Sequence, residues 1–389
     1  MKNIVRRSHA GALLASMVMM SALFAIQGSL LSNIIDHFRL SDSAQGLASS
    51  ATFVGGVVAL VASFLLMGRL PKLLLLRLAM ALSFFSLVLL YFAPSYDFFV
   101  IIWFVIGIGL GFMDTLLSAC IADIYTGKDA TRMMCILHMC FGISGMISPL
   151  IFTALMNGGV PWNQVYVYVA AAGAVLLIFA CFIFSRSGLG RESASASQKL
   201  SLKDMLSLLK TGPLPLLVAA MFFHGMFLSG MNTWINRYVG VTLGSDMGAM
   251  GLSCMFFGVM ISRLLLPMLP ITTRTFVRCG GILAGIIVLA GIVIGNGTVM
   301  CIAVCIGGLA FGAMIPCLLS IACAATPENT FFATTALMFS YYIGQSIISP
   351  IIGALEASIS LHAGIALCAL CIIVTSLMCL FNKHISKDI

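Results

Sequence analysis

The stretch IGIGLGFMDTLLSACIA, residues 106–122, places one acidic residue, Asp114, inside an apolar run that glycines interrupt. A short polar connector, DIYTGKDATR, follows at 123–132, and a second apolar run then carries His138 and ends near Pro149. A charged side chain in the hydrocarbon of a membrane costs at least about 2.5 kcal/mol. If these runs cross a membrane, Asp114 is therefore predicted to have a function.

The composition is that of a membrane protein. Of the 389 residues, 61% are hydrophobic and 8% are charged, whereas about 25% of the residues of a soluble domain are charged. A helix needs about 20 apolar residues to cross the hydrocarbon. Twelve such runs are predicted, at 10–32, 45–67, 74–93, 98–121, 132–156, 163–184, 213–236, 247–267, 276–295, 298–322, 330–354 and 361–381. The expected fold is an all-α integral membrane protein with twelve transmembrane helices.

The positive charge indicates topology and not nucleic-acid binding. The formal net charge is +8, and with the N-terminus inside the cell every Lys and Arg except Arg39 and Arg237 falls in a cytoplasmic segment. By the positive-inside rule, both termini are expected in the cytoplasm. We expect a multi-pass protein of a bacterial-type inner membrane, in contact with anionic lipid heads. The first 25 residues could also be a cleaved signal peptide, but the many later spans favour an uncleaved first helix.

The chain divides into two similar halves. A Ser-, Gly- and Lys-rich segment at 185–212 reads as a cytoplasmic linker between halves 1–184 and 213–389. ISPLIFTAL at 147–155 is repeated as IISPIIGAL at 347–355, and LLSAC at 116–120 as LLSIAC at 318–323. Parallel six-helix repeats with a binding site near the midplane are typical of one large transporter architecture.

Several of these segments resemble a known family. GIGLGFMDTLLSA (107–119) and LHMCFGISGMISPL (137–150) resemble the major facilitator superfamily, and within it the fucose–galactose–proton symporter and sugar permease group. FFGVMISRLLLPML (256–269) resembles the superfamily's helix 8, and GGLAFGAMIPCLLS (307–320) its helix 10. The loop GRLPKLLLLR (68–77) lacks the acidic residue of the superfamily's signature loop. The resemblance implies a monomeric transporter that works by alternating access, and not an enzyme.

Asp114 and His138 are the candidate proton-coupling residues. Gly107, Gly111, Asp114 and Ser118 share one helical stripe, and small residues let helices approach closely. Burial disfavours the charged form of a carboxylate, so Asp114 could take up a proton. His138 lies at a matching depth on the next helix and could share that proton. The alternatives are a structural Asp114 bonded to a hydroxyl such as that of Thr115, and a His138 that packs against the preceding helix.

Polar residues within the predicted spans are the candidate solute ligands. Amides suit hydroxyl-rich solutes because they both donate and accept hydrogen bonds. Polar interhelical contacts are the alternative explanation. Trp234 could stack on a sugar ring or belong to an interfacial aromatic belt. The predicted substrate-binding residues are Gln27, Asn33, His224, Ser229, Asn232, Trp234, Asn236, Tyr341 and Gln345.

A third group of residues is expected to be structural or to act in gating. Arg263, at the cytoplasmic end of its helix, is expected to be an anchor or gate. The others are Gly142, Gly145, Pro149, Pro316 and Pro350. Five of the other acids, Asp36, Asp42, Asp97, Asp246 and Glu356, are expected to be exposed at or near the outer ends of helices and in loops.

The sequence therefore favours a proton-coupled symporter of a small hydroxylated solute such as a sugar. It contains no nucleotide-binding motif or metal-ligand cluster, so the proton gradient is the expected energy source, with no cofactor. The expected partners are the solute, protons and lipids, without nucleic acid. An efflux antiporter for drugs or metabolites, or a membrane receptor that does not transport, are the alternatives.

Overall fold

A computed structural model describes residues 2–41, 44–66, 70–125, 127–185, 212–326 and 330–382. Almost all of the predicted linker, and Asp42, lie outside these ranges. The helices of the first half are α1 (Lys2–Ser29), α2 (Leu31–Phe38), α3 (Leu47–Leu66), α4 (Lys72–Tyr91), α5 (Tyr96–Ile124), α6 (Gly127–Asn157) and α7 (Gln164–Ser185). Those of the second half are α9 (Leu214–Arg237), α10 (Met250–Leu265), α11 (Thr273–Ile294), α12 (Gly297–Phe311), α13 (Met314–Ala325), α14 (Thr330–Ser358) and α15 (Leu361–Phe381).

Among the described residues, 10 helices are long and apolar enough to cross a membrane. Two shorter apolar helices, Leu47–Ser63 and Met250–Leu265, occupy the second and eighth predicted spans. The tenth predicted span is divided between α12 and α13. The predicted all-α membrane fold is confirmed.

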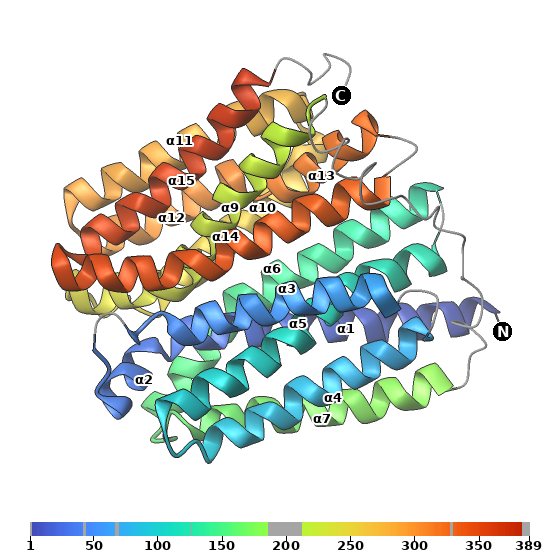
Figure 1. Ribbon diagram of the computed structural model, residues 1–389, viewed down its shortest axis with the longest axis horizontal. Helices are drawn as coiled ribbons and strands as arrows, with labels where there is room; N and C mark the ends of the chain where they lie inside the picture. Colours follow the sequence, from blue (N-terminus) through green and yellow to red (C-terminus); the bar gives the residue numbers. More distant parts are fainter. Residues whose placement is uncertain are drawn as a thin grey trace. The chain divides into compact units, whose positions relative to one another are not determined.

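The chain forms two compact units, whose helices Figure 1 labels. The N-terminal unit comprises Met1–Ile34 and Ala51–Ser197, and the C-terminal unit comprises Ile35–Ser50 and Gln198–Ile389. Within the first, α1 packs against α6, and α4 packs against α5 and α7. Within the second, α9 packs against α14 and α15, α10 against α12, and α11 against α15. The segment Ile35–Ser50 thus belongs with the C-terminal unit although it lies early in the sequence.

The two units repeat one mode of helix packing. In the N-terminal unit, the Ser21 hydroxyl donates to the Phe141 carbonyl at 2.6 Å, and Ser144 donates back to Val18 at 2.6 Å. These bonds join α1 and α6, the first and fifth spans of their half. In the C-terminal unit, α9 and α14 are joined in the same way, by Ser229 to the Gln345 carbonyl at 3.0 Å and Ser340 to the Val218 carbonyl at 2.8 Å. Reciprocal serine-to-carbonyl bonds are a physical counterpart of the repeat seen in the sequence.

Several helices begin at a polar cap. The side chains of Ser95, Thr272, Asn296 and Ser360 each accept a hydrogen bond from the main-chain N–H three residues later. Such a cap satisfies one of the N–H groups that the first turn leaves without a helical partner. These four residues therefore fix where α5, α11, α12 and α15 begin.

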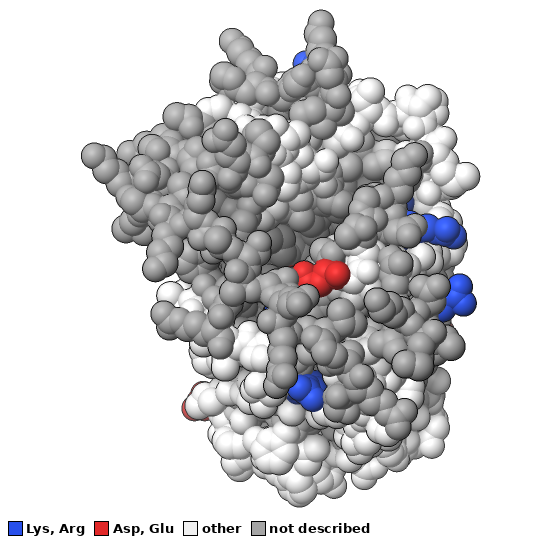
Figure 2. Space-filling view, turned by 90° about the vertical axis from the view of Figure 1, so that its right-hand side faces the viewer, with Lys and Arg blue, Asp and Glu red and all other residues white. Residues whose placement is uncertain are grey.

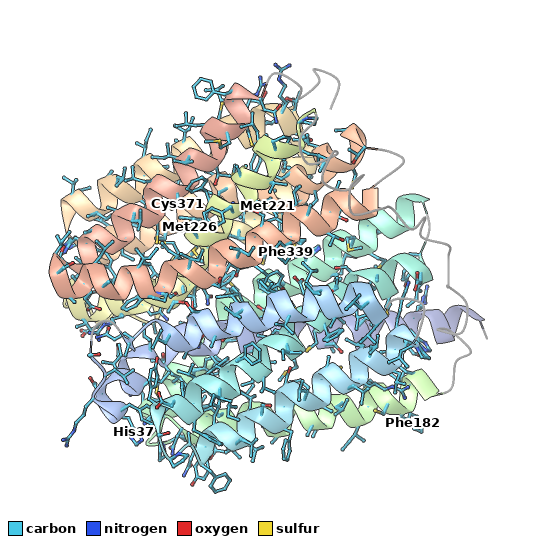
Figure 3. All side chains as sticks on the ribbon, viewed as in Figure 1. His37, Phe182, Met221, Met226, Phe339 and Cys371 are labelled. Atoms are coloured by element: carbon cyan, nitrogen blue, oxygen red, sulfur yellow. The ribbon has the colours of Figure 1, made fainter. Side chains whose placement is uncertain are left out.

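Apolar side chains lie both inside the units and on their outer surfaces. Met221 and Met226 on α9 and Cys371 on α15 are buried within the C-terminal unit (Figure 3). Phe182 on α7 is 56% exposed. A surface that presents large apolar side chains suits contact with lipid tails.

Glu356 is not exposed, contrary to the prediction from its position near a helix end. Its side chain is 17% exposed, and its Oε1 accepts two hydrogen bonds from the guanidinium of Arg237, at 3.2 and 3.3 Å. Arg237 ends α9, and Glu356 is in the last turn of α14. This ion pair therefore joins the same two helices as the serine bonds.

We expect Arg237→Met to destabilise the protein by about 3 kcal/mol, because it leaves Glu356 largely buried without its cation. The double variant Arg237→Met/Glu356→Gln should recover part of this loss, since no charge then remains unpaired. Thermal unfolding of the purified protein in detergent measures the loss of stability in the single variant and its partial recovery in the double variant. Equal melting temperatures for the single and double variants would contradict this assignment of the pair.

Candidate functional site

The glycines of α5 let it approach α3 closely. A Cβ added at Gly107 would overlap the Thr52 carbonyl, and one at Gly111 would lie 2.7 Å from the Cβ of Ala59. Both neighbours belong to α3. The stripe of small residues on α5 therefore makes the close helix contact that the sequence predicts. Asp114 lies on this stripe, one turn beyond Gly111, and its side chain is half-buried.

Asp114 does not receive the Thr115 hydroxyl proton. Thr115 donates instead to the carbonyl of Gly111, four residues earlier on the same helix, at 2.5 Å. A hydroxyl carries one hydrogen, so this bond occupies it. A structural role for Asp114 would therefore need a hydroxyl other than that of Thr115.

His138 lies on α6, which packs against α5. Its side chain is half-buried, as is that of Asp114. Their placement on neighbouring helices of one unit is consistent with a shared role, and the exchange of a proton between them remains a prediction.

Two of the predicted solute ligands belong to the N-terminal unit. Gln27, near the end of α1, is 6% exposed, and its Nε2 has no hydrogen-bond partner among the described residues. Asn33 is half-buried on α2. A buried amide nitrogen without an acceptor costs about 1–3 kcal/mol, so Gln27 is the stronger candidate of the two.

In the C-terminal unit, much of the predicted polar stripe joins α9 to α14. A Cβ at Gly225 would overlap the Tyr341 carbonyl, and one at Gly344 would overlap the Phe222 carbonyl. Ser229, predicted to bind solute, donates its hydroxyl to the Gln345 carbonyl. Gly225, Ser229 and Gly344 therefore take part in the close packing of α9 against α14. For Ser229 this favours the alternative explanation, a polar contact between helices.

A smaller group on the same two helices keeps unsatisfied polar atoms. His224 is 1% exposed, and its Nδ1 has no hydrogen-bond partner among the described residues. Its ring stacks on Tyr341, with centroids 6.1 Å apart. Gln345, one turn beyond Tyr341, is 1% exposed and has an equally unpaired Oε1. A native structure retains such costly groups where a ligand or water satisfies them, so we take His224, Tyr341 and Gln345 as the candidate solute site of this unit.

The remaining predicted ligands on α9 have different surroundings. Asn232 is 3% exposed. Trp234 is fully buried, which does not fit the alternative of an interfacial belt, and its Nε1 has no partner in the described part of the chain. Asn236 accepts a hydrogen bond from the Leu252 N–H at 2.9 Å and so caps the first turn of α10. Because this cap already gives Asn236 a structural role, we leave it out of the candidate site.

Two of the prolines leave a main-chain carbonyl without its helical N–H donor, and the side chain of another residue donates a hydrogen bond to that carbonyl. Pro350 lies inside α14 and cannot donate to the carbonyl of Ser346, four residues earlier. That carbonyl accepts the hydroxyl of Ser50. Likewise, the carbonyl of Gly312, four residues before Pro316, accepts a hydrogen bond from Arg263 Nε at 3.0 Å. Pro149 lies within α6, where it is buried with Gly142 and Gly145.

The sequence analysis missed the segment Gly46–Ser50. A Cβ at Gly46 would overlap main-chain atoms of Ser349 on α14. The Ser49 hydroxyl lies 2.9 Å from that of Thr233 on α9. The one available signal was the group of small residues, Gly46, Ala48, Ser49 and Ser50, at the start of a predicted span.

Comparison with known proteins places these features in a family. The model of the Major Facilitator Superfamily matches residues 12–349. Protein TsgA of Salmonella newport (strain SL254) and of Salmonella agona (strain SL483) are each 26% identical over 241 residues, covering 60% of this chain and 59% of theirs.

Solved structures extend the similarity of fold. A bacterial homologue of the human lysosomal transporter Spinster, in an inward-facing and occupied conformation, aligns with a TM-score of 0.74 and 13% identity, covering 97% of both chains. FucP in the outward conformation aligns with a TM-score of 0.68 and 17% identity, covering 97% of this chain and 99% of that one. The E. coli fucose:proton symporter FucP aligns with a TM-score of 0.67 and 17% identity, covering 95% of this chain and 98% of that one.

Proposed function

The chain belongs to the Major Facilitator Superfamily, a superfamily of transporters and not of enzymes, and we propose that it is a proton-coupled symporter of a small hydroxylated solute such as a sugar. It would work by alternating access, with a proton gradient as its energy source and without a cofactor. A monomer with solute, protons and lipids as its partners is the expected working form.

The observation that carries the proposal is the group of buried, unsatisfied polar atoms on α9 and α14. His224 Nδ1 and Gln345 Oε1 have no described hydrogen-bond partner, and the neutral imidazole and the amide can each donate and accept. The Tyr341 ring beside His224 adds an apolar face. A hydroxyl-rich ring with apolar faces matches both features.

Asp114 supports the choice of the proton as coupling ion. Among the acids in the described helices, Asp114 lies furthest from the ends of its helix, α5. Acids within transmembrane segments commonly mark proton pathways. The fucose:proton symporter among the structural neighbours supports the same pairing of sugar and proton.

The proposed orientation places both termini in the cytoplasm of a bacterial-type cell, across its inner membrane. Figure 2 shows the face at the N-terminal end of α1, where Lys and Arg side chains (blue) lie at several separate places and Asp or Glu (red) lies near the centre. The sequence supports this orientation, because every Lys and Arg except Arg39 and Arg237 falls in a predicted cytoplasmic segment, and an excess of basic residues favours the cytoplasmic side.

A thermal-shift screen of the purified protein against a library of sugars, polyols, drugs and other metabolites tests the proposal. We expect a sugar or polyol to raise the melting temperature, because a ligand that binds only the folded state stabilises it. Stabilisation by apolar drugs alone would favour efflux, an alternative to which the apolar rings of Phe227 and Phe311, packed together at 4.7 Å, lend support. A complete lack of hits in both classes would contradict the proposed site.

We expect Gln345→Met to abolish the ligand-induced shift without lowering the melting temperature of the free protein. The substitution removes a buried acceptor that has no described partner, and an apolar side chain of similar length avoids that cost. Ser229→Ala is the matched control, because it removes a hydroxyl that does have a partner, the Gln345 carbonyl. It should lower the melting temperature of the free protein and keep the shift. The reverse pattern would show that Gln345 is structural.

A further inference from the structure

The tenth span is interrupted where α12 ends and α13 begins. Gly312 still donates its N–H to Gly308 at 2.8 Å, but Ala313 leaves the helical conformation with φ −96° and ψ 11°. Pro316 has no N–H, and so the Gly312 carbonyl lacks the donor that an unbroken helix would supply. In a membrane such a carbonyl needs a partner from elsewhere.

Arg263 supplies that partner. Its Nε donates to the Gly312 carbonyl at 3.0 Å from the last turn of α10. Gly312 makes this approach possible, because a Cβ there would lie 2.6 Å from the Cα of Val259 and 2.9 Å from the Cβ of Ser262, both on α10. The small residue at the break therefore lets α10 approach closely enough for Arg263 to bond to the Gly312 carbonyl.

Phe311, the last residue of α12, packs against His224 of the candidate solute site. Phe311 is 3% exposed. Its ring centroid lies 6.0 Å from that of His224, at an interplanar angle of 63°, and 4.7 Å from that of Phe227, at 85°. Any change in the path of the chain at Gly312 moves Phe311 relative to His224.

We propose that Arg263 is a positioning residue for the solute site: by holding the carbonyl that Pro316 leaves without a helical donor, it fixes the break and sets Phe311 against His224. This role rests on the proposed function for its effect on solute binding, but the break itself does not. It differs from that of a membrane-surface anchor, for which any basic residue at the end of a helix would serve.

The double-mutant cycle of Arg263→Gln and Pro316→Ala tests the proposal. Alanine at 316 has an N–H that can donate to Gly312, which makes the guanidinium dispensable. The reporter is native Cys317, which is 6% exposed and follows Pro316, and the fully buried Cys368 on α15 is the internal control. Alkylation of each cysteine by N-ethylmaleimide can be followed by mass spectrometry of its peptide.

We expect Arg263→Gln to speed the labelling of Cys317 about tenfold, the factor for losing one hydrogen bond from a charged donor, without changing Cys368. Adding Pro316→Ala should return Cys317 to the wild-type rate. Arg274→Gln, which removes a basic residue near the start of α11, should leave both rates unchanged. Unchanged labelling in Arg263→Gln, or no reversal by Pro316→Ala, would overturn the proposal.

Two further outcomes are separable. If Arg263→Gln unfolds the protein, Cys368 also becomes labelled. The single variant Pro316→Ala then provides the test, and it should slow the labelling of Cys317. An unchanged labelling rate of Cys317 in Pro316→Ala would contradict the proposal. In solute binding, Arg263→Gln should weaken the affinity for the thermal-shift ligand, and the double variant should restore it. If no solute binds the wild type, the proposed function fails while the labelling still decides the role of Arg263.

Discussion

Asp114→Asn is expected to abolish uphill, proton-driven accumulation of the solute and to leave solute exchange intact. Asparagine has nearly the same shape and still offers polar atoms to its neighbours, but it cannot take up and release a proton. A symporter without its coupling acid can still carry bound solute across in both directions. Uptake into proteoliposomes with an imposed proton gradient measures the first property, and counterflow without a gradient measures the second.

Asp97→Asn is the matched control for this prediction. Asp97 lies in the first turn of the same helix, α5, and its side chain is exposed. We expect accumulation to be normal in that variant, because an exposed carboxylate near the membrane surface contributes little. Normal accumulation in Asp114→Asn would contradict the coupling role of Asp114, and a loss of exchange as well would indicate that it binds the solute or supports the fold.

Gly46→Val is expected to destabilise the folded protein by about 1–3 kcal/mol and to lower the rate of transport, because valine overpacks a close contact. A Cβ at this position overlaps main-chain atoms of Ser349, which cannot move aside as a flexible side chain can. The variant therefore separates the start of α3 from α14. It should also lose the bonds of Ser49 to Thr233 and of Ser50 to the Ser346 carbonyl.

The segment is important because α3 continues from it into the other unit. Ser50 belongs to the C-terminal unit and Ala51 to the N-terminal unit. Leu47→Val, at the next position along the chain, is the control: Leu47 is 43% exposed and should tolerate the change. Initial uptake rates, normalised to the amount of protein in the vesicles, compare the two. Equal rates would show that the contact at Gly46 has no part in transport.

The sequence predicts the fold well because the membrane imposes strong rules. Spans must be apolar and about 20 residues long, and so the twelve runs and the helices agree closely. The sequence also predicts the role of two glycines on α5. Gly107 and Gly111 lie on one stripe of small residues, and this stripe packs closely against α3. Proline was a weaker signal: the span with Pro316 is interrupted, whereas α14 continues through Pro350.

The candidate site was harder to predict, because a polar stripe looks the same whether it faces a ligand or another helix. Ser229 and Asn236 have the inward position expected of them, yet their polar atoms bond to Gln345 and Leu252. Their partners are far away in the sequence or in another helix, where periodicity gives no information. The pairing of Arg237 with Glu356 escaped prediction for the same reason.

The central claim, proton-coupled symport, is tested most directly by proton movement in proteoliposomes that contain the wild-type protein. The solute found by the thermal-shift screen is added to the outside of vesicles in a weakly buffered medium, and the external pH is recorded. We expect the solute to make the external medium more alkaline, because each solute molecule entering by symport removes protons from it. Solute entry without alkalinisation, or with acidification, would contradict the account.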